Sequence, residues 1–225
     1  MRRLLPLTVF LAVAIAAAAV FAATSPADVD PSNFVRKIDN PWYPLQPGTT
    51  YVFRGVEDGK PMRDVVAVTT RRKKILGVSC IVVRDIVYVD GRPTEVTSDW
   101  FAQDRKGNVW YFGEATAELD RSGKVKSREG SWQAGVDGAK PGIVMPGRPR
   151  VGQSFRQEYL KGHAEDHMAI QSLAAKVSVP YVTTSRAIRT REWTPLEPGV
   201  VEHKYYVRGL GMVKDDEVSL VSVTR

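Results

Sequence analysis

The chain of 225 residues carries 32 Lys and Arg against 25 Asp and Glu, a formal net charge of +7 at pH 7. Its 43% hydrophobic and 25% charged residues are typical of a globular protein and exclude a disordered one. The basic excess is spread along the sequence apart from residues 71–74 (Arg-Arg-Lys-Lys). No aromatic residues are interleaved with that run, so nucleic-acid binding is not expected.

The first residues have the pattern of a secretory signal peptide. Arg2 and Arg3 precede an apolar run at 4–20, and Val20-Phe21-Ala22 supplies a small-x-small cleavage pattern. We therefore expect a signal peptide at 1–22, a linker at 23–30 and one β-rich domain at 31–225, exported to the periplasm or the outside. The alternative is an uncleaved anchor, because the apolar run is about long enough to span a bilayer. Membrane contact is expected only through this segment.

Cys80 is the only cysteine, so no internal disulfide can form. It lies in the apolar, β-prone stretch 78–83, which predicts a buried and unreactive thiol. Stability must then come from a hydrophobic core.

The predicted elements begin with a short helix, for which Asp30 is the N-cap and Pro31 the first helical residue. Pro41, Pro44 and Pro47 end it and make the next segment an irregular strap. We expect the helix and strap to cover a sheet edge or one open mouth of the fold.

Short β-prone segments separated by turn signals follow along the rest of the chain. The expected strands are 51–55, 65–70, 79–89, 96–103, 109–113, 154–160, 166–173, 176–181, 186–193, 200–207 and 218–224. The expected turns are 57–60, 90–91, 104–108 and 121–124. An amphipathic helix at 163–175 is an alternative to a strand there. This rhythm predicts a mainly β fold: an antiparallel, strongly twisted meander that forms a sandwich or a partly open barrel.

Two further segments carry specific expectations. Residues 135–149 are rich in Gly and Pro, which predicts an irregular loop, either a packed crossover or a functional loop. In strand 200–207, alternation places Val201, His203, Tyr205 and Val207 on one face, and we expect this more apolar face to point to the core.

One predicted hairpin is unusually aromatic on both of its faces. The rings are either ordinary core or the lining of an apolar ligand pocket. The candidate ligand-binding residues are Trp100, Phe101, Trp110, Phe112 and Trp132.

The polar residues provide no catalytic motif. Carboxylates on the aromatic hairpin could face each other, as in a hydrolase that uses an acid and a base. The polar candidates are Asp99, Glu114, Glu165, Asp166, Glu202 and His203. His163 and His167 also stand near Glu165, but the spacing fits no metal-ligand motif, so we expect no metal and no cofactor.

Several blocks resemble a family of uncharacterised exported bacterial proteins. They are IDNPWYPLQPGT at 38–49, DWFAQD at 99–104, GNVWYFGE at 107–114, the Gly-rich stretch at 130–142 and TPLEPGVVEHKYY at 194–206. The likeness covers about residues 34–214 and implies export but no activity, substrate or cofactor. It also implies that a histidine metal site is not a family trait, because relatives have Met at the position of His167 and Asn at that of His203.

These observations favour an exported binding module for an apolar small molecule, a lipid or a partner segment. A first alternative is a carboxylate-dependent hydrolase of the cell envelope. A second is an envelope interaction protein that uses the basic surface near residues 71–74 on anionic polymers. The sequence leaves the oligomeric state open.

Overall fold

The structure is a computed structural model that describes residues 29–225. The predicted signal peptide and almost all of the predicted linker lie outside these residues. Within residues 29–225, no helix has the length and apolar composition needed to cross a bilayer.

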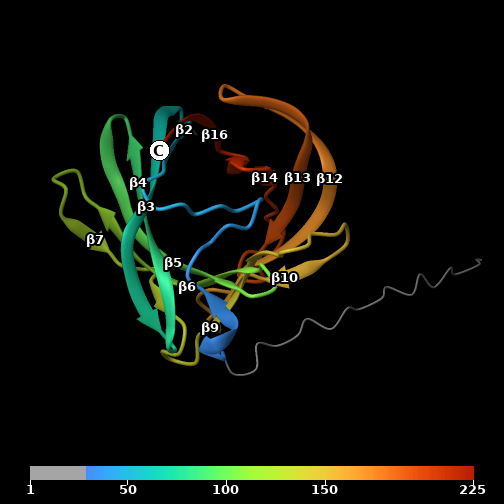
Figure 1. The fold of residues 1–225 in the computed structure, drawn as a ribbon. Coiled ribbons are helices and arrows are strands. Elements are labelled where there is room, and N and C mark those ends of the chain that lie inside the picture. The colour runs from blue at the N-terminus through green and yellow to red at the C-terminus, as the bar shows by residue number, and fades with distance from the viewer. Residues whose placement is uncertain (1–28) are drawn as a thin grey trace, which may run out of the picture.

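The described chain forms one antiparallel sheet that curls into a nearly closed barrel, as the predicted meander requires (Figure 1). The first half of the sheet is β2 (Thr50–Glu57), β3 (Lys60–Ile75), β4 (Val78–Val89), β5 (Arg92–Asp104), β6 (Val109–Leu119), β9 (Lys140–Met145) and β11 (Glu158–Tyr159). The second half is β10 (Ser154–Arg156), β12 (His167–Val179), β13 (Val182–Trp193), β14 (Tyr205–Val207), β15 (Gly211–Lys214) and β16 (Val218–Thr224). Strand β16 pairs with β2 and joins the halves.

Short strands attach to this path at two places. Strand β1 (Phe34–Val35) pairs with the end of β5. Strands β7 (Val125–Ser127) and β8 (Trp132–Gln133) both pair with β6.

The tight hairpins follow from residues that accept a positive φ. Asp58-Gly59 and Asp90-Gly91, both predicted turns, have φ of 49° and 74°, and of 52° and 75°. Two successive positive φ values suit the right-handed twist of the flanking strands. The third such turn, Leu76-Gly77, has φ of 48° and 81° and joins β3 to β4. It was not predicted, because Leu is an unusual residue at the first of these positions.

The barrel closes at one residue, Gln157. On one side of it β10 pairs with β12, and on the other β11 pairs with β9. The Gln157 backbone N–H donates to the carbonyl of Asp166 (2.7 Å). The chain therefore crosses from one half of the sheet to the other within three residues.

The strap that was predicted from its prolines crosses one end of the barrel, from β5 to the turn between β14 and β15 (Figure 1). Its anchor is Asn40, which is 2% exposed. The Asn40 side chain donates to the carbonyls of Gly107 (2.8 Å) and Pro146 (3.1 Å), and Gly209 N–H donates to the carbonyl of Pro41 (2.7 Å). These bonds hold Tyr43 and Leu45 over the barrel interior.

Two apolar clusters lie on opposite faces of the strongly curved sheet. The larger faces the barrel interior and includes Phe53, Phe101, Ile188 and Leu220. The smaller lies outside, beneath the N-terminal segment, and its members are Ile75, Val78, Cys80, Val82, Trp100, Ala102, Phe112, Trp132, Ala134, Ala139 and Ala164. Hairpin β5–β6 lies between the two clusters. One of its faces packs into the inner cluster and the other into the outer cluster, which explains why both faces are apolar.

The structure corrects several local predictions. A three-residue 3₁₀ turn, η1 (Pro31–Asn33), capped by Asp30, stands where a short helix was predicted, and residues 29–225 contain no α-helix. The segment 135–149 is not wholly irregular, because its middle is strand β9. The alternative helix at 163–175 is wrong, because β12 occupies most of that segment. Only Tyr205–Val207 of the predicted strand 200–207 is regular, and β15 was not predicted.

Strand β9 requires a glycine at position 142 because the backbone of residues 156 and 157 crosses it there. A Cβ atom at Gly142 would overlap the backbone carbonyls of Arg156 and Gln157. We expect Gly142→Ala to lower the free energy of unfolding by about 3 kcal/mol, since the closing corner would have to shift. Gly138→Ala in the same segment is the control: it has open space and a φ of 80°, so only about 1 kcal/mol is expected. Urea denaturation measures both, and equal losses would contradict this role for Gly142.

Candidate ligand-binding cavity

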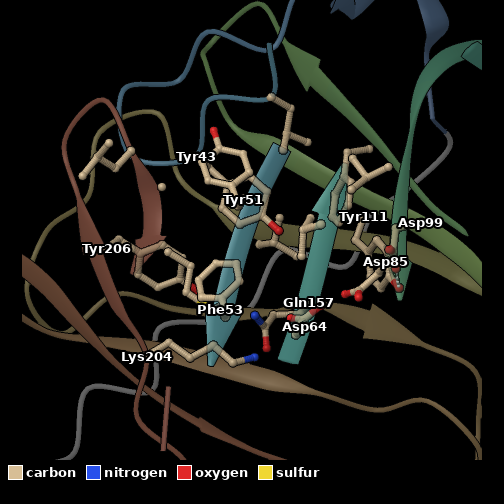
Figure 2. Close-up of a pocket in the computed structure, with 18 of the residues that line it drawn as sticks. Tyr43, Tyr51, Phe53, Asp64, Asp85, Asp99, Tyr111, Gln157, Lys204 and Tyr206 are labelled. Atoms are coloured by element: carbon tan, nitrogen blue, oxygen red, sulfur yellow. Dashed lines mark hydrogen bonds between the residues drawn. The ribbon is translucent and has the colours of Figure 1, made fainter. Parts of the chain in front are cut away.

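A cavity of about 280 Å³ lies inside the barrel and is partly open to solvent (Figure 2). Interiors of domains this size are ordinarily filled to crystal density, so a hollow of several water volumes is a distinct feature. Its lining comes from the strap and from both halves of the sheet. The lining residues are Tyr43, Leu45, Tyr51, Phe53, Asp64, Val66, Val83, Asp85, Asp99, Phe101, Tyr111, Val144, Gln157, Glu158, Asp166, Lys204, Tyr206, Leu210, Gly211 and Met212.

One side of the cavity is a row of four rings, which we call the aromatic wall: Tyr206, Tyr43, Phe101 and Tyr111. The centroid of Tyr43 lies 6.2 Å from that of Tyr206 and 5.6 Å from that of Phe101. Phe101 stacks on Tyr111 at 4.8 Å. Because the rings come from β14, the strap, β5 and β6, the wall forms only when the barrel is closed and capped.

Three carboxylates from consecutive strands form what we call the acidic belt: Asp64 on β3, Asp85 on β4 and Asp99 on β5. The strand register explains why they meet. Asp85 pairs with Val66, two residues along β3 from Asp64, and Asp99 pairs with Val83, two residues along β4 from Asp85. Residues two apart share a face, so all three carboxylates point into the barrel.

Burial keeps these carboxyls from ionising normally. Burial first, and then the hydrogen bond and charge of Asp64, raise the pKa of Asp85 to about 9. Burial, followed by the charge of Asp85, raises the pKa of Asp99 to about 7, and it also raises the pKa of Asp64. The neighbouring Glu114 and Glu158 have pKa values of about 8 and about 7, again mainly through burial. Near neutral pH the empty barrel therefore holds part of this cluster protonated.

One cationic side chain, Lys204, lines the cavity among the residues that the structure describes, and it is paired with Glu192. Lys204 Nζ lies 2.8 Å from Glu192 Oε2, and the charge of Glu192 raises the pKa of Lys204. Glu192 is 6% exposed and also accepts from Thr190 (2.9 Å) and Tyr206 (3.3 Å). Burial raises the pKa of Glu158 and Asp166, and the charge of Lys204 partly offsets that rise, but no cationic side chain in the described cavity lining is paired with the acidic belt.

Of the five aromatic residues predicted to bind a ligand, Phe101 lies on the cavity wall. Trp100 and Phe112 are buried in the outer cluster, and Phe112 packs against Phe34. Trp110 is partly buried and donates through Nε1 to Asp104 (2.9 Å). Trp132 belongs to the outer cluster but meets the edge of Tyr111, with centroids 5.3 Å apart. A ligand-binding role for the set stays a prediction.

The six polar candidates are only partly brought together. Asp99 and Asp166 line the cavity, and Glu114 pairs with Asp99 across β5 and β6. Glu165 instead accepts from the backbone of Gly162 (2.7 Å). The other two candidates, Glu202 and His203, stand outside the cavity lining, and His203 lies near Asp216.

The expectation about strand 200–207 is wrong in its choice of face. Lys204 and Tyr206 point into the barrel, and Tyr206 is 3% exposed. The apolar face was chosen because a core was expected inside. The interior of this barrel is polar at this point, where Glu192 holds Lys204.

Other chemical features of the sequence lie away from the cavity. Cys80 is buried, and burial raises the pKa of its thiol to about 12, as predicted for an unreactive thiol. Two members of the basic run 71–74 are engaged, because Arg72 donates to the carbonyl of Arg36 (2.7 Å) and Lys73 Nζ lies 3.3 Å from the Trp100 ring centroid. His167 stacks on Trp193, and no group of His, Cys, Asp and Glu in residues 29–225 is arranged to hold a metal ion.

Sequence reasoning missed the other charged residues of the cavity, which are Asp64, Asp85, Glu158 and Lys204, and three rings of the aromatic wall, Tyr43, Tyr111 and Tyr206. A signal was present in β3 and β4, where Asp64 and Asp85 share a face with valines instead of with other polar residues. A carboxylate at an inward position of a strand is unusual and marks a polar interior.

We expect the acidic belt to make stability fall as the pH rises. A carboxyl with a raised pKa binds more protons in the folded than in the unfolded state, so its contribution is lost between the unfolded pKa near 4 and the folded value. For Asp85→Asn, the fall in the free energy of unfolding between pH 5 and pH 8 should be about 2 kcal/mol smaller than for the wild type. Urea denaturation at several pH values measures this. Asp58→Asn in an exposed turn should follow the wild type, and an unchanged slope for Asp85→Asn would contradict the prediction.

Comparisons with protein-family models, with curated proteins and with solved structures find no match for this chain. The family suggested by the sequence blocks thus remains a prediction, and any assignment of function must come from the geometry of the cavity.

Proposed function

We propose that the protein binds a compact small molecule inside its barrel, with the apolar part of the ligand against the aromatic wall. The observation that carries this proposal is the hollow itself, which lies where a barrel of this size would otherwise pack its core. Its volume of about 280 Å³ is near the lower end for ligand sites, which favours a compact ligand over a lipid or a partner segment. Export of the binding protein is an additional proposal and depends on residues 1–22.

The composition of the wall supports binding more than simple packing. Tyr43, Tyr111 and Tyr206 present hydroxyl groups together with large apolar faces, a combination that is common where ligands bind. Two of these hydroxyls already have partners, since Tyr111 donates to Asp99 (2.8 Å) and Tyr206 to Glu192 (3.3 Å). The rings are therefore held in place before a ligand enters, which lowers the entropy lost on binding.

Filling the cavity tests this proposal. Val66 lines it, and we expect Val66→Phe to weaken binding of N-phenyl-1-naphthylamine, an uncharged dye that fluoresces in apolar surroundings, by about tenfold or more. Val65→Phe is the matched control, because Val65 lies on the opposite face of the same strand. Circular dichroism checks that both variants fold. Equal dye binding by Val66→Phe and the wild type, or no dye binding by the wild type, would contradict the proposal.

A carboxylate-dependent hydrolase is the second candidate, and one observation favours it. Asp99 and Glu158 line the same cavity, and each has a pKa of about 7, so one can be protonated while the other is ionised at neutral pH. Such a pair can serve as general acid and general base.

The two candidates predict different results with chromogenic substrates. The binding proposal predicts that a panel of p-nitrophenyl esters and glycosides is not hydrolysed above the buffer rate. Turnover that is lost in Asp99→Asn and in Glu158→Gln, but kept in the exposed variant Glu197→Gln, would establish the hydrolase instead. The release of p-nitrophenolate, followed by absorbance, distinguishes them.

A further inference from the structure

We propose that the ligand of this cavity carries a positively charged amine, which docks between the acidic belt and the aromatic wall. The inference rests on the proposed binding function and adds the charge of the ligand to it. Three independent features of the cavity point to a cation.

The first feature is the balance of charge. Five carboxyl side chains line the cavity, and they are Asp64, Asp85, Asp99, Glu158 and Asp166. The lining has one cationic side chain among the described residues, Lys204, and Glu192 neutralises it at 2.8 Å. Part of these carboxyls is ionised near neutral pH, and a negative charge enclosed by protein attracts a positive ligand more strongly than the same charge would in water.

The second feature is a pair of buried oxygen atoms that lack donors. Asp64 and Asp85 can share one hydrogen bond when one of them is protonated, but within residues 29–225 no N–H or O–H group of another residue donates to their buried Oδ1 atoms. Asp64 is only 8% exposed, and both side chains face the cavity (Figure 2). An acceptor left unsatisfied in this way is unfavourable, and it is expected to have a partner in the working state of the protein. A primary ammonium group offers three N–H donors, enough to satisfy both oxygens.

The third feature is the position of the aromatic wall beside the acidic belt. The Tyr111 hydroxyl donates to Asp99 Oδ1 at 2.8 Å, so the wall and the belt meet at this pair. Phe101 and Tyr43 continue the wall from there. Ring faces attract cations, and carboxylates and aromatic rings together are a recognised means of binding organic amines. An anionic ligand would meet the belt at close range and be repelled.

The protonation of the cluster supports the same inference. A bound cation would favour the ionised carboxylates, so amine binding at pH 7 should release protons, chiefly from Asp85, whose pKa is about 9, and in part from Asp99, whose pKa is about 7 and which is half protonated at this pH. A bound cation will also change the pKa values of the other titratable groups in and around the cavity. The groups that act on the belt through their charge or a hydrogen bond, or that line the cavity beside it, are Tyr43, Glu95, Tyr111, Glu114, Glu158, Asp166, Lys204 and Asp215.

Three matched probes test the inference with the full chain: 2-phenylethylamine, its neutral analogue 2-phenylethanol, and the anion 3-phenylpropanoate. In isothermal titration calorimetry we expect the amine to bind about tenfold more tightly than the alcohol, and the anion to bind less tightly than either. The apparent enthalpy for the amine should differ between phosphate and Tris at pH 7, because the released proton is taken up by the buffer.

Substitutions in the acidic belt then test whether the preference for the amine arises there. Asp85→Asn/Asp99→Asn should remove the preference for the amine over the alcohol and abolish proton release, whereas alcohol binding should remain. Asp58→Asn, the same chemical change in an exposed turn, should behave as the wild type. Thermal melting confirms that each variant is folded, and if the double variant is not, the single Asp85→Asn must reduce the preference.

The outcomes separate the inference from the function on which it rests. Equal binding of amine and alcohol, or an amine preference that survives the substitutions, would overturn the cationic ligand. The binding function would stand in that case, provided that the naphthylamine dye still binds and Val66→Phe still excludes it. Absence of binding by the dye and by all three probes would overturn both.

Discussion

The enclosure of several carboxyl groups without a counter-charge is the constraint on which the rest of this structure depends. Successive residues of a strand point to opposite faces, so a closed meander must place every second side chain of β3, β4 and β5 inside. At three of these positions the sequence has an aspartate. Carboxylates cannot be packed tightly against one another without a counter-charge, and the one lysine in the lining is committed to Glu192. The interior is hollow at this place, where a core of Val and Leu would have filled it.

The strap and the closing corner turn this hollow into a defined cavity. Asn40 fastens the strap to the ends of β5 and β9, and the strap delivers Tyr43 to the wall. Gln157 carries the chain between the two halves of the sheet and also reaches Glu192 (3.4 Å). The ion pair, the corner and the strap thus lie around one cavity, so a change in its charge will reach the elements that close the barrel.

Much of the fold follows from local sequence, whereas the site does not. Asp58-Gly59 and Asp90-Gly91 predict their hairpins because Gly accepts the left-handed conformation at little cost. Strand β9 was not predicted because a glycine such as Gly142 usually indicates a loop. Its role in the strand depends on the backbone of Gln157, which crosses it closely in the folded barrel. The rings of the aromatic hairpin were predicted to be either ordinary core or the lining of a pocket, and alternation alone does not tell the inner Phe101 from the outer Trp100. The assignment depends on the N-terminal segment with Phe34, which covers the outer face. Lys204 was missed because its partner Glu192 lies 12 residues earlier, on β13, and only the folded barrel brings the two side chains together.

Carbon-detected NMR titration of the side-chain carboxyls of Asp85 and Asp99 in the ligand-free protein tests the central claim most directly. The account predicts that both groups titrate far above an ordinary aspartate, Asp85 at about 9 and Asp99 at about 7. Titration of both near 4, the ordinary value, would mean that the belt is fully solvated. The two carboxyls would then not be enclosed by the barrel, and the basis for a cationic ligand would be lost.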